Sequence, residues 1–160
     1  MKNEILNAIE KNSKINPKEL AILLGKDEIE IMNEIANLEK EGIICGYHTL
    51  INWEKTTRDN VTALIEVRVT PQRGQGFDKI AERIYQYEEV NSVYLISGGY
   101  DLLVTIEGKS LKDVSSFVSY KLSTLEYVLS TATHFILKKY KDHGTVFAKQ
   151  HDDYREVIMP

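Results

Sequence analysis

Gly25 separates two short helical patterns and limits what the N-terminal third of the chain can form. Before it, Asn16 is suited to cap a helix, Pro17 suits the first helical position, and Glu19 completes a box-like capping pattern. After it, Asp27 can cap a second helix, so that only a few residues are left for the turn. Two helices joined this tightly predict a helix-turn-helix motif.

Apolar residues recur at helical spacing through this region and predict three amphipathic helices. They are Ile5, Leu6 and Ile9 in the first segment, Leu20, Leu23 and Leu24 in the second, and Ile31, Ile35 and Leu38 in the third. Gly42 ends the third helix, and residues 43–51 (IICGYHTLI) predict the strand of a winged motif. We therefore predict a winged helix-turn-helix domain over residues 1–57, which ends in the polar, turn-rich stretch 52–60.

The hydrophobic period changes in the second half, where strand and helix patterns follow one another. The predicted strands cover residues 61–69, 90–97, 100–108 and 128–141, and the predicted helices cover 77–88 and 110–126. Gly98-Gly99 predicts a tight turn between the middle strands. This order predicts a ferredoxin-like βαββαβ domain over residues 58–141, followed by a polar tail at 142–160. The predicted fold class is therefore α+β.

A sheet with this topology carries helices on one face only. Its other face would present mixed residues such as Leu64, Glu66 and Arg68. Because a partly apolar face of this size favours contact with another surface, we expect two copies of the chain to dimerise sheet to sheet.

Composition and charge exclude several classes of protein. The net charge is −4, so no overall positive field steers the chain to nucleic acid. The single Cys45 cannot form an intrachain disulfide, which fits a reducing compartment. The N-terminus lacks the apolar stretch of a signal peptide, and no run approaches 18 apolar residues. We expect a cytoplasmic protein without a membrane span.

No pattern of catalytic or metal-binding residues is present. The four histidines (His48, His134, His143 and His151) do not have the spacing of metal ligands, and no histidine is close to Cys45 in a nucleophilic arrangement. We therefore expect no metal, no cofactor and no enzymatic activity.

Three motifs occur in a characteristic order. They are LEKEGIICGYHTLIN at 38–52, SGGYDLLVTIEG at 97–108 and STATHFILKKYK at 130–141. Together they resemble the Lrp/AsnC (feast/famine) family of prokaryotic transcription regulators, over roughly residues 3–141. The resemblance implies a DNA-binding N-terminal half and dimers that assemble into octamers. It also implies a C-terminal half that senses a small effector between dimers, often an amino acid.

The effector-binding residues that this resemblance implies surround the predicted Gly-Gly turn. They are Gly98, Gly99, Tyr100 and Asp101, with Thr131 and Thr133 on the last strand as weaker candidates. Adjacent glycines let a ligand approach the backbone amides closely, and Asp101 can accept hydrogen bonds from an ammonium group. An alternative stays open at this point: the two glycines only make the hairpin, and Asp101 only caps it.

The second helix of the motif is acidic, which is unusual for a helix that enters DNA. Residues 27–41 hold six carboxylates and one ammonium, a net charge of −5. Carboxylates repel phosphates, yet Asn33 and Asn37 lie one turn apart and can contact adenine edges. Lys14, Lys18 and Lys26 are the candidates for phosphate contacts.

Three functions are compatible with these features to different degrees. The main hypothesis is an Lrp/AsnC-type regulator that binds DNA and an amino acid. The alternative is a metabolite-sensing or assembly module whose helix-turn-helix no longer binds DNA. An enzyme resembling siroheme decarboxylases, which have a similar two-part architecture, would need converging basic and histidine residues, and this sequence offers no such cluster.

Overall fold

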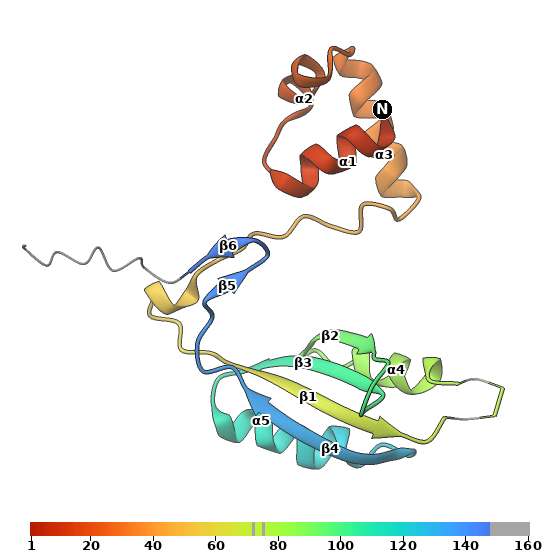
Figure 1. Ribbon diagram of the computed structural model, residues 1–160, viewed down its shortest axis with the longest axis vertical. Helices are drawn as coiled ribbons and strands as arrows, with labels where there is room; N and C mark the ends of the chain where they lie inside the picture. The colour runs from red at the N-terminus through yellow and green to blue at the C-terminus, as the bar shows by residue number, and fades with distance from the viewer. Residues whose placement is uncertain (72, 75, 148–160) are drawn as a thin grey trace, which may run out of the picture. The chain divides into compact units, whose positions relative to one another are not determined.

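The chain divides into two compact units, Met1–Ile51 and Asn52–Pro160 (Figure 1). This computed structural model describes residues 1–71, 73–74 and 76–147. The predicted boundary after residue 57 lies in the polar segment just beyond the division. Most of the predicted tail, residues 148–160, lies outside the described residues.

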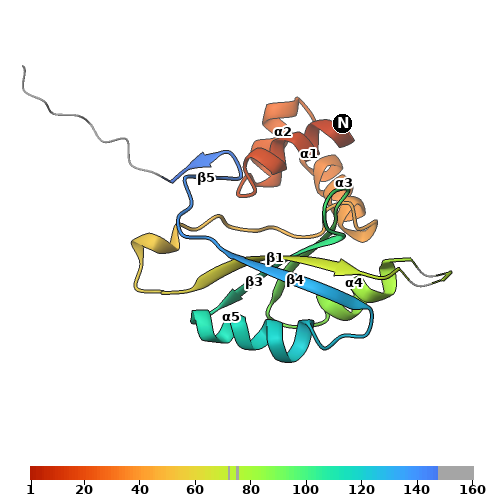
Figure 2. The ribbon, with the colours of Figure 1, turned by 60° about the horizontal axis from the view of Figure 1, so that its bottom comes forward.

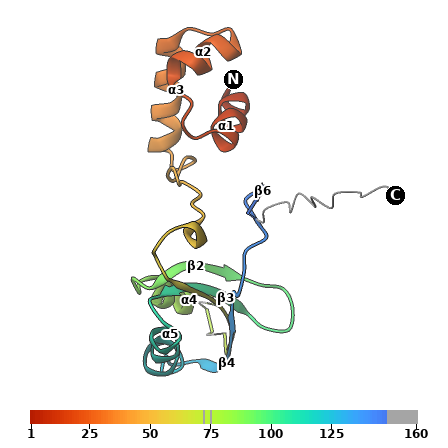
Figure 3. The same cartoon turned by 90° about the vertical axis from the view of Figure 1, so that its left-hand side faces the viewer.

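The first unit consists of three helices packed on one small core (Figure 3). They are α1 (Lys2–Lys11), α2 (Pro17–Leu24) and α3 (Glu28–Lys40). The core holds Ile5, Leu20, Ala21, Ile31 and Leu38. Leu23 was predicted to face this core but is 65 % exposed, so that prediction is wrong. Leu20 and Leu24 are one turn apart on the inner face, and Ala21 takes the third inner position because it lies three residues before Leu24.

Side-chain caps define where α2 and α3 begin, as predicted. Asn16 Oδ1 accepts a hydrogen bond from the N–H of Glu19 at 2.8 Å, and the Glu19 carboxylate accepts one from the N–H of Asn16 at 3.3 Å. Asp27 Oδ1 accepts from the N–H of Ile29 at 2.9 Å. Gly25 has φ 62°, a left-handed conformation that glycine adopts without steric cost. The tight turn between the helices therefore depends on these few residues.

The predicted strand over residues 43–51 is wrong for the single chain. The N–H groups of Ile43 and Ile44 both donate to the carbonyl oxygen of Leu38, at 2.9 and 3.1 Å, and so close the end of α3. Among the described residues, no strand pairs with 45–51. A strand requires a partner for its backbone groups, and the described part of the chain supplies none here.

The second unit contains a four-stranded antiparallel sheet with the strand order β2-β3-β1-β4. Its elements are β1 (Val61–Val69), α4 (Asp78–Tyr85), β2 (Val90–Leu95), β3 (Leu102–Gly108), α5 (Leu111–Phe117), the π-helical turn η2 (Val118–Leu122) and β4 (Val128–Phe135). A short 3-10 turn, η1 (Trp53–Lys55), precedes β1. Figure 2 shows α4 and α5 on the same side of the sheet. The predicted ferredoxin-like order of elements is confirmed.

Alternate residues of β1 divide the two faces of the sheet. Ala63, Ile65, Val67 and Val69 are buried beneath the helices, where they join apolar residues of β3, α4 and α5 in the main core. Leu64, Glu66 and Arg68 point to the other face, as expected, and are more exposed. Glu66 lies 3.3 Å from Nε2 of His134 across the strand pair on this uncovered face.

Several predicted elements extend too far, most of all the last strand and the last helix. β4 ends at Phe135 rather than residue 141. The N–H of Ile136 donates to the carbonyl oxygen of Thr62, which is at the start of β1. Because β1 begins there, the residues after Ile136 no longer lie beside that strand. Residues 141–146 instead form a small hairpin of β5 (Lys141–Asp142) and β6 (Thr145–Val146). The helix predicted to run to residue 126 is α-helical only to Phe117.

Among the described helices, none combines the length and the apolar content that crossing a bilayer requires.

The capping box of α2 makes a measurable contribution to stability. Replacing Asn16 by Ala removes the acceptor for the N–H of Glu19, and we expect a loss of about 1 kcal/mol in the free energy of unfolding. Urea unfolding followed by helical circular dichroism measures this loss. Asn7→Ala, on an exposed position of α1, is the control and should not destabilise. Equal effects of the two substitutions would contradict the role of the cap.

Two isoleucines of α3 provide a matched test of the core. Ile31 is 0 % exposed and Ile29 is 68 % exposed. Ile31→Ala should lower the free energy of unfolding by about 2–5 kcal/mol because it leaves a cavity, whereas Ile29→Ala should change it little. Thermal and urea unfolding of both variants measure the difference. Similar losses would mean that α3 is oriented differently on its core.

Candidate functional site

The outward face of α3 carries amides, apolar side chains and two ionised groups of opposite sign. Its exposed residues at helical spacing are Ile29, Glu30, Met32, Asn33, Ala36, Asn37 and Lys40. The opposite face packs on the core through Ile31, Ile35 and Leu38. We refer to the outward residues as the α3 stripe. Asn33 lies near its middle, Asn37 lies toward one edge beside Glu30, and Lys40 is its one basic residue.

Apart from Glu30, the carboxylates of this helix lie on its flanks rather than on the stripe. At 3.6 residues per turn, Glu34 and Glu41 lie to one side, and Glu28 and Glu39 lie to the other. A net charge of −5 over residues 27–41 therefore overstates the negative charge that faces outward from the centre of α3.

Several of these carboxylates also have local partners. Asp27 caps the helix, and Glu41 pairs with Lys2 Nζ at 3.1 Å. The hydroxyl of Tyr47 donates to Glu39 at 2.9 Å. Partial burial and this bond to Glu39 raise the pKa of Tyr47 above its ordinary value. These contacts give structural reasons for acids in a helix of this kind.

The predicted phosphate-contacting lysines are all accessible. Lys14 lies between α1 and α2, Lys18 is in the first turn of α2, and Lys26 lies in the turn before α3. In the part of the chain that the structure describes, none of the three forms a salt bridge. Their ammonium groups are therefore available to an external anion.

Sequence reasoning missed an apolar surface on the helix-turn-helix. Ile22 and Leu23 at the end of α2 are exposed, together with Ile29 and Met32 on α3. The spacing of Leu20, Ala21 and Leu24 was a usable signal, because a helix that packs these three positions on the core turns Ile22 and Leu23 outward.

The second candidate site is the loop between β2 and β3, at one end of the sheet. The N–H of Ile96 donates to the carbonyl of Asp101 at 2.8 Å, so four residues, 97–100, make the turn. The predicted two-residue turn is therefore wrong. Gly98 and Gly99 are exposed and not in the left-handed region, and a Cβ on Gly99 would meet nothing within 4 Å. The backbone of this loop is accessible to a ligand.

Asp101 connects this loop to the central strand. Its Oδ2 accepts from the N–H of Val69 at 2.9 Å, and its own N–H donates to the carbonyl of Val67 at 3.1 Å. Both bonds lie beside the register shift between Arg68 and Val69, where β1 leaves its regular pairing. Asp101 therefore has a structural role. Among the described residues, no donor is found for its other carboxylate oxygen, Oδ1.

The two threonines lie on β4, on the helix-covered side of the sheet. Thr131 pairs with Val67 and Thr133 with Ile65; these two partners are fully buried, whereas the threonines are half-buried. Thr131 and Asp101 thus flank the end of β1 from the two neighbouring strands, whereas Thr133 lies nearer the middle. Thr131 Oγ1 is 3.3 Å from the hydroxyl of Ser123. Tyr100 is half-buried in the loop.

Within the described ranges, no group of three His, Cys, Asp or Glu side chains converges as metal ligands would.

Comparisons with known proteins agree with this two-unit architecture. Residues 62–146 match the Lrp/AsnC ligand binding domain. The chain is 51 % identical over 158 residues to the HTH-type transcriptional regulator YugG of Bacillus subtilis, which covers 98 % of this chain and 95 % of that protein. It is 27 % identical over 148 residues to the leucine-responsive regulatory protein of Haemophilus influenzae, with 91 % and 87 % covered.

A solved structure shares the fold over nearly the whole chain. The L-Met complex of a transcriptional regulator from Neisseria meningitidis has a TM-score of 0.70 at 22 % identity, and the match covers 94 % of this chain and 96 % of that one. The order of elements, the matched domain and the close relative lead to one assignment. The chain belongs to the Lrp/AsnC family of HTH-type transcriptional regulators.

Proposed function

We propose that this regulator binds operator DNA through α3 of two paired copies and senses an amino acid through its C-terminal unit. The observation that carries the DNA-binding part is the α3 stripe, whose exposed residues are amides, apolar side chains, one lysine and one glutamate. Such a protein acts where the chromosome lies, so we place it in the cytoplasm.

The α3 stripe suits the edges of base pairs better than the phosphate backbone. The amides of Asn33 and Asn37 can each donate to and accept from an adenine edge in the major groove. Phosphate contacts are assigned to Lys14, Lys18 and Lys26, all exposed around the motif. Because carboxylates flank the helix, we expect weak binding by one copy, strong salt sensitivity, and a gain from several linked copies.

A homodimer would place two such helices on one operator. The face of the sheet that α4 and α5 leave uncovered carries Leu64, Glu66 and Arg68, and it includes the exposed Tyr94 of β2. A self-complementary contact through this mixed face fits twofold symmetry. We further propose that dimers assemble into octamers, as the family resemblance implies.

The effector is assigned to the 98–101 loop and the end of β4. The accessible amides beside Gly98 and Gly99 can hold a carboxylate, and Oδ1 of Asp101 can accept from an ammonium group. Tyr100, Thr131 and Thr133 complete the proposed set of residues. The Neisseria meningitidis regulator, which shares this fold, was solved with L-Met, and this supports an amino acid as the class of ligand.

A second function is favoured by the exposed apolar residues and flanking acids of the first unit. Ile22 and Leu23 lie beside a helix whose flanks are acidic, a surface that suits a protein partner better than DNA. In this alternative the chain is a metabolite-sensing or assembly module. Ligand binding in a thermal-shift screen, together with no DNA binding at low salt, would support it.

The asparagines of the α3 stripe provide the test of DNA binding. Asn33→Ala and Asn37→Ala should each weaken binding to a selected operator by about 1–3 kcal/mol, because a bidentate contact to adenine is lost. The operator is first selected from genomic fragments at low salt, and affinities are then measured by gel shift.

Asn7→Ala on α1 is the matched control and should bind like the unchanged chain. Equal affinity of all three variants would refute base contacts by the α3 stripe. If no genomic fragment shifts with or without amino acids, the DNA-binding proposal fails.

Asp101→Asn tests the effector site. Asparagine can still accept the bond from the N–H of Val69, so the loop should keep its shape while the charge that attracts an ammonium group is removed. We expect amino-acid binding at this loop to weaken about tenfold or more. Calorimetric titration measures it, with Asp78→Asn on exposed α4 as the control. Unchanged binding would place the effector elsewhere.

A further inference from the structure

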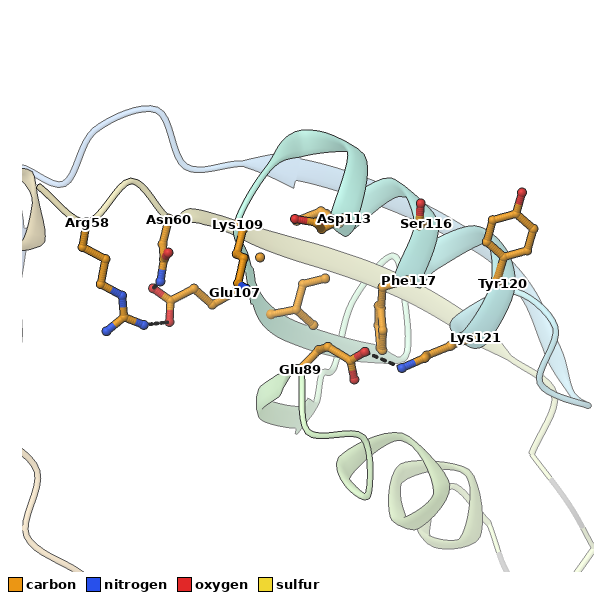
Figure 4. A pocket seen from close by; sticks show the side chains of 13 residues that line it. Arg58, Asn60, Glu89, Glu107, Lys109, Asp113, Ser116, Phe117, Tyr120 and Lys121 are labelled. Carbon is orange, nitrogen blue, oxygen red and sulfur yellow. Dashed lines mark hydrogen bonds and ion pairs between the residues drawn. The ribbon is translucent and has the colours of Figure 1, made fainter.

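A cavity lies in the C-terminal unit, at the end of β3 that is farthest from the 98–101 loop (Figure 4). Its volume is about 750 Å³, within the usual range of small-molecule sites, roughly 300–1,000 Å³. The lining comes from the end of β3, from α5 and η2, and from the segments before β1 and β2. β3 alone separates it from the 98–101 loop by on the order of 20 Å, at about 3.4 Å per residue.

The inner wall of this cavity is apolar. Ile106 and Val114 are 1 % exposed and Phe117 is 4 % exposed, and all three contribute to the lining. Gly108 lets α5 pack closely at this point, since a Cβ there would lie 3.1 Å from Cγ2 of Val114. The wall can therefore hold an apolar group against a rigid part of the core.

Internal ion pairs bound the cavity at both ends. Arg58 Nη2 lies 3.5 Å from Glu107, to which Asn60 also donates at 3.0 Å. At the other end Lys121 donates to Glu89, and this bond lowers the pKa of the Glu89 carboxyl below its ordinary value. Figure 4 shows both pairs with their contacts. These four charges are neutralised within the chain.

Lys109 and Asp113 are the remaining charged residues of the lining. They stand four positions apart, and no salt bridge to either is found in residues 1–71, 73–74 and 76–147. One ammonium and one carboxylate thus face the cavity without a partner of opposite charge. A ligand with a net charge would be attracted by one of these groups and repelled by the other, whereas a zwitterion can form an ion pair with both.

The helix beside the cavity is irregular. The N–H of Ser123 donates to the carbonyl of Val118 at 2.8 Å, a bond that closes the π-helical turn η2. Such turns are rare and occur frequently at functional sites. One inserted residue rotates the residues after it by roughly 100° relative to a regular α-helix. Here the turn contains Tyr120 and Lys121, and both line the cavity.

We propose that this cavity is a second small-molecule site, which binds a zwitterion with an apolar body, of the size of an amino acid. Asp113 takes the ammonium group, Lys109 takes the carboxylate, and the apolar body lies on Ile106, Val114 and Phe117. Phosphorylated ligands are disfavoured, because the three cations of the lining are matched by three carboxylates. The site is distinct from the proposed effector site at the 98–101 loop and does not depend on it.

The test is calorimetric titration of the full chain with L-leucine, L-methionine and L-phenylalanine. The Asp101→Asn chain should retain binding of at least one of them, at the cavity. In that background, Asp113→Asn or Lys109→Gln should raise the Kd about tenfold or more, and Ser116→Phe should weaken binding because its ring occupies part of the cavity. Lys112→Gln, an exposed neighbour outside the lining, is the control and should change nothing.

Analogues with one charge test the class of ligand. L-Leucinamide lacks the carboxylate and N-acetyl-L-leucine lacks the ammonium group, so both should bind more weakly than L-leucine. No binding in the Asp101→Asn chain, or binding unaffected by the Lys109, Asp113 and Ser116 variants, would overturn the proposal. Binding that is lost in Asp113→Asn but unchanged in Asp101→Asn would support the cavity and refute the effector site at the loop.

Discussion

The C-terminal unit depends on β1, which pairs with β3 on one side and β4 on the other. Its inward residues, such as Ile65 and Val67, form the centre of the core. Its outward residues, such as Leu64 and Glu66, leave the opposite face of the sheet uncovered. The two candidate ligand sites lie at opposite ends of this strand. The 98–101 loop lies at its last residue, Val69, to which Asp101 bonds, and the cavity lies at its first residue, Val61, which follows Asn60. One strand therefore supports the core, the proposed dimer face and both sites.

The position of charge on α3 matters more than its amount. Counting residues 27–41 suggests a surface that repels DNA. Helical geometry places most of the acids on the flanks, where Asp27 caps the helix and Glu41 pairs with Lys2. The outward face keeps Asn33 and Asn37, with Glu30 beside Asn37. In the proposed function, the affinity for DNA comes from base contacts and from linked copies rather than from a positive field.

The two ends of the sheet differ in how they can recognise a ligand. At the 98–101 loop, accessible backbone and one oxygen of Asp101 are available, and no deep apolar wall is part of the described loop. At the cavity, Ile106 and Phe117 supply an apolar wall, and Lys109 and Asp113 supply opposite charges. A loop on the surface is suited to a ligand that another copy helps to enclose, whereas the cavity can hold one within a single chain.

Local chemistry was sufficient to predict the helix starts at Asn16 and Asp27, the extent of β1 over residues 61–69 and the order of elements in the second unit. Helix caps and the alternation of apolar and polar residues in a strand involve only a few neighbouring residues, so they can be recognised in the sequence. The failures share another cause. Residues 43–51 and 136–141 have the composition of strands, but a strand exists only where a neighbour accepts its hydrogen bonds. The cavity escaped prediction for a related reason, because packing brings Arg58, Glu89 and Asp113 together from distant segments.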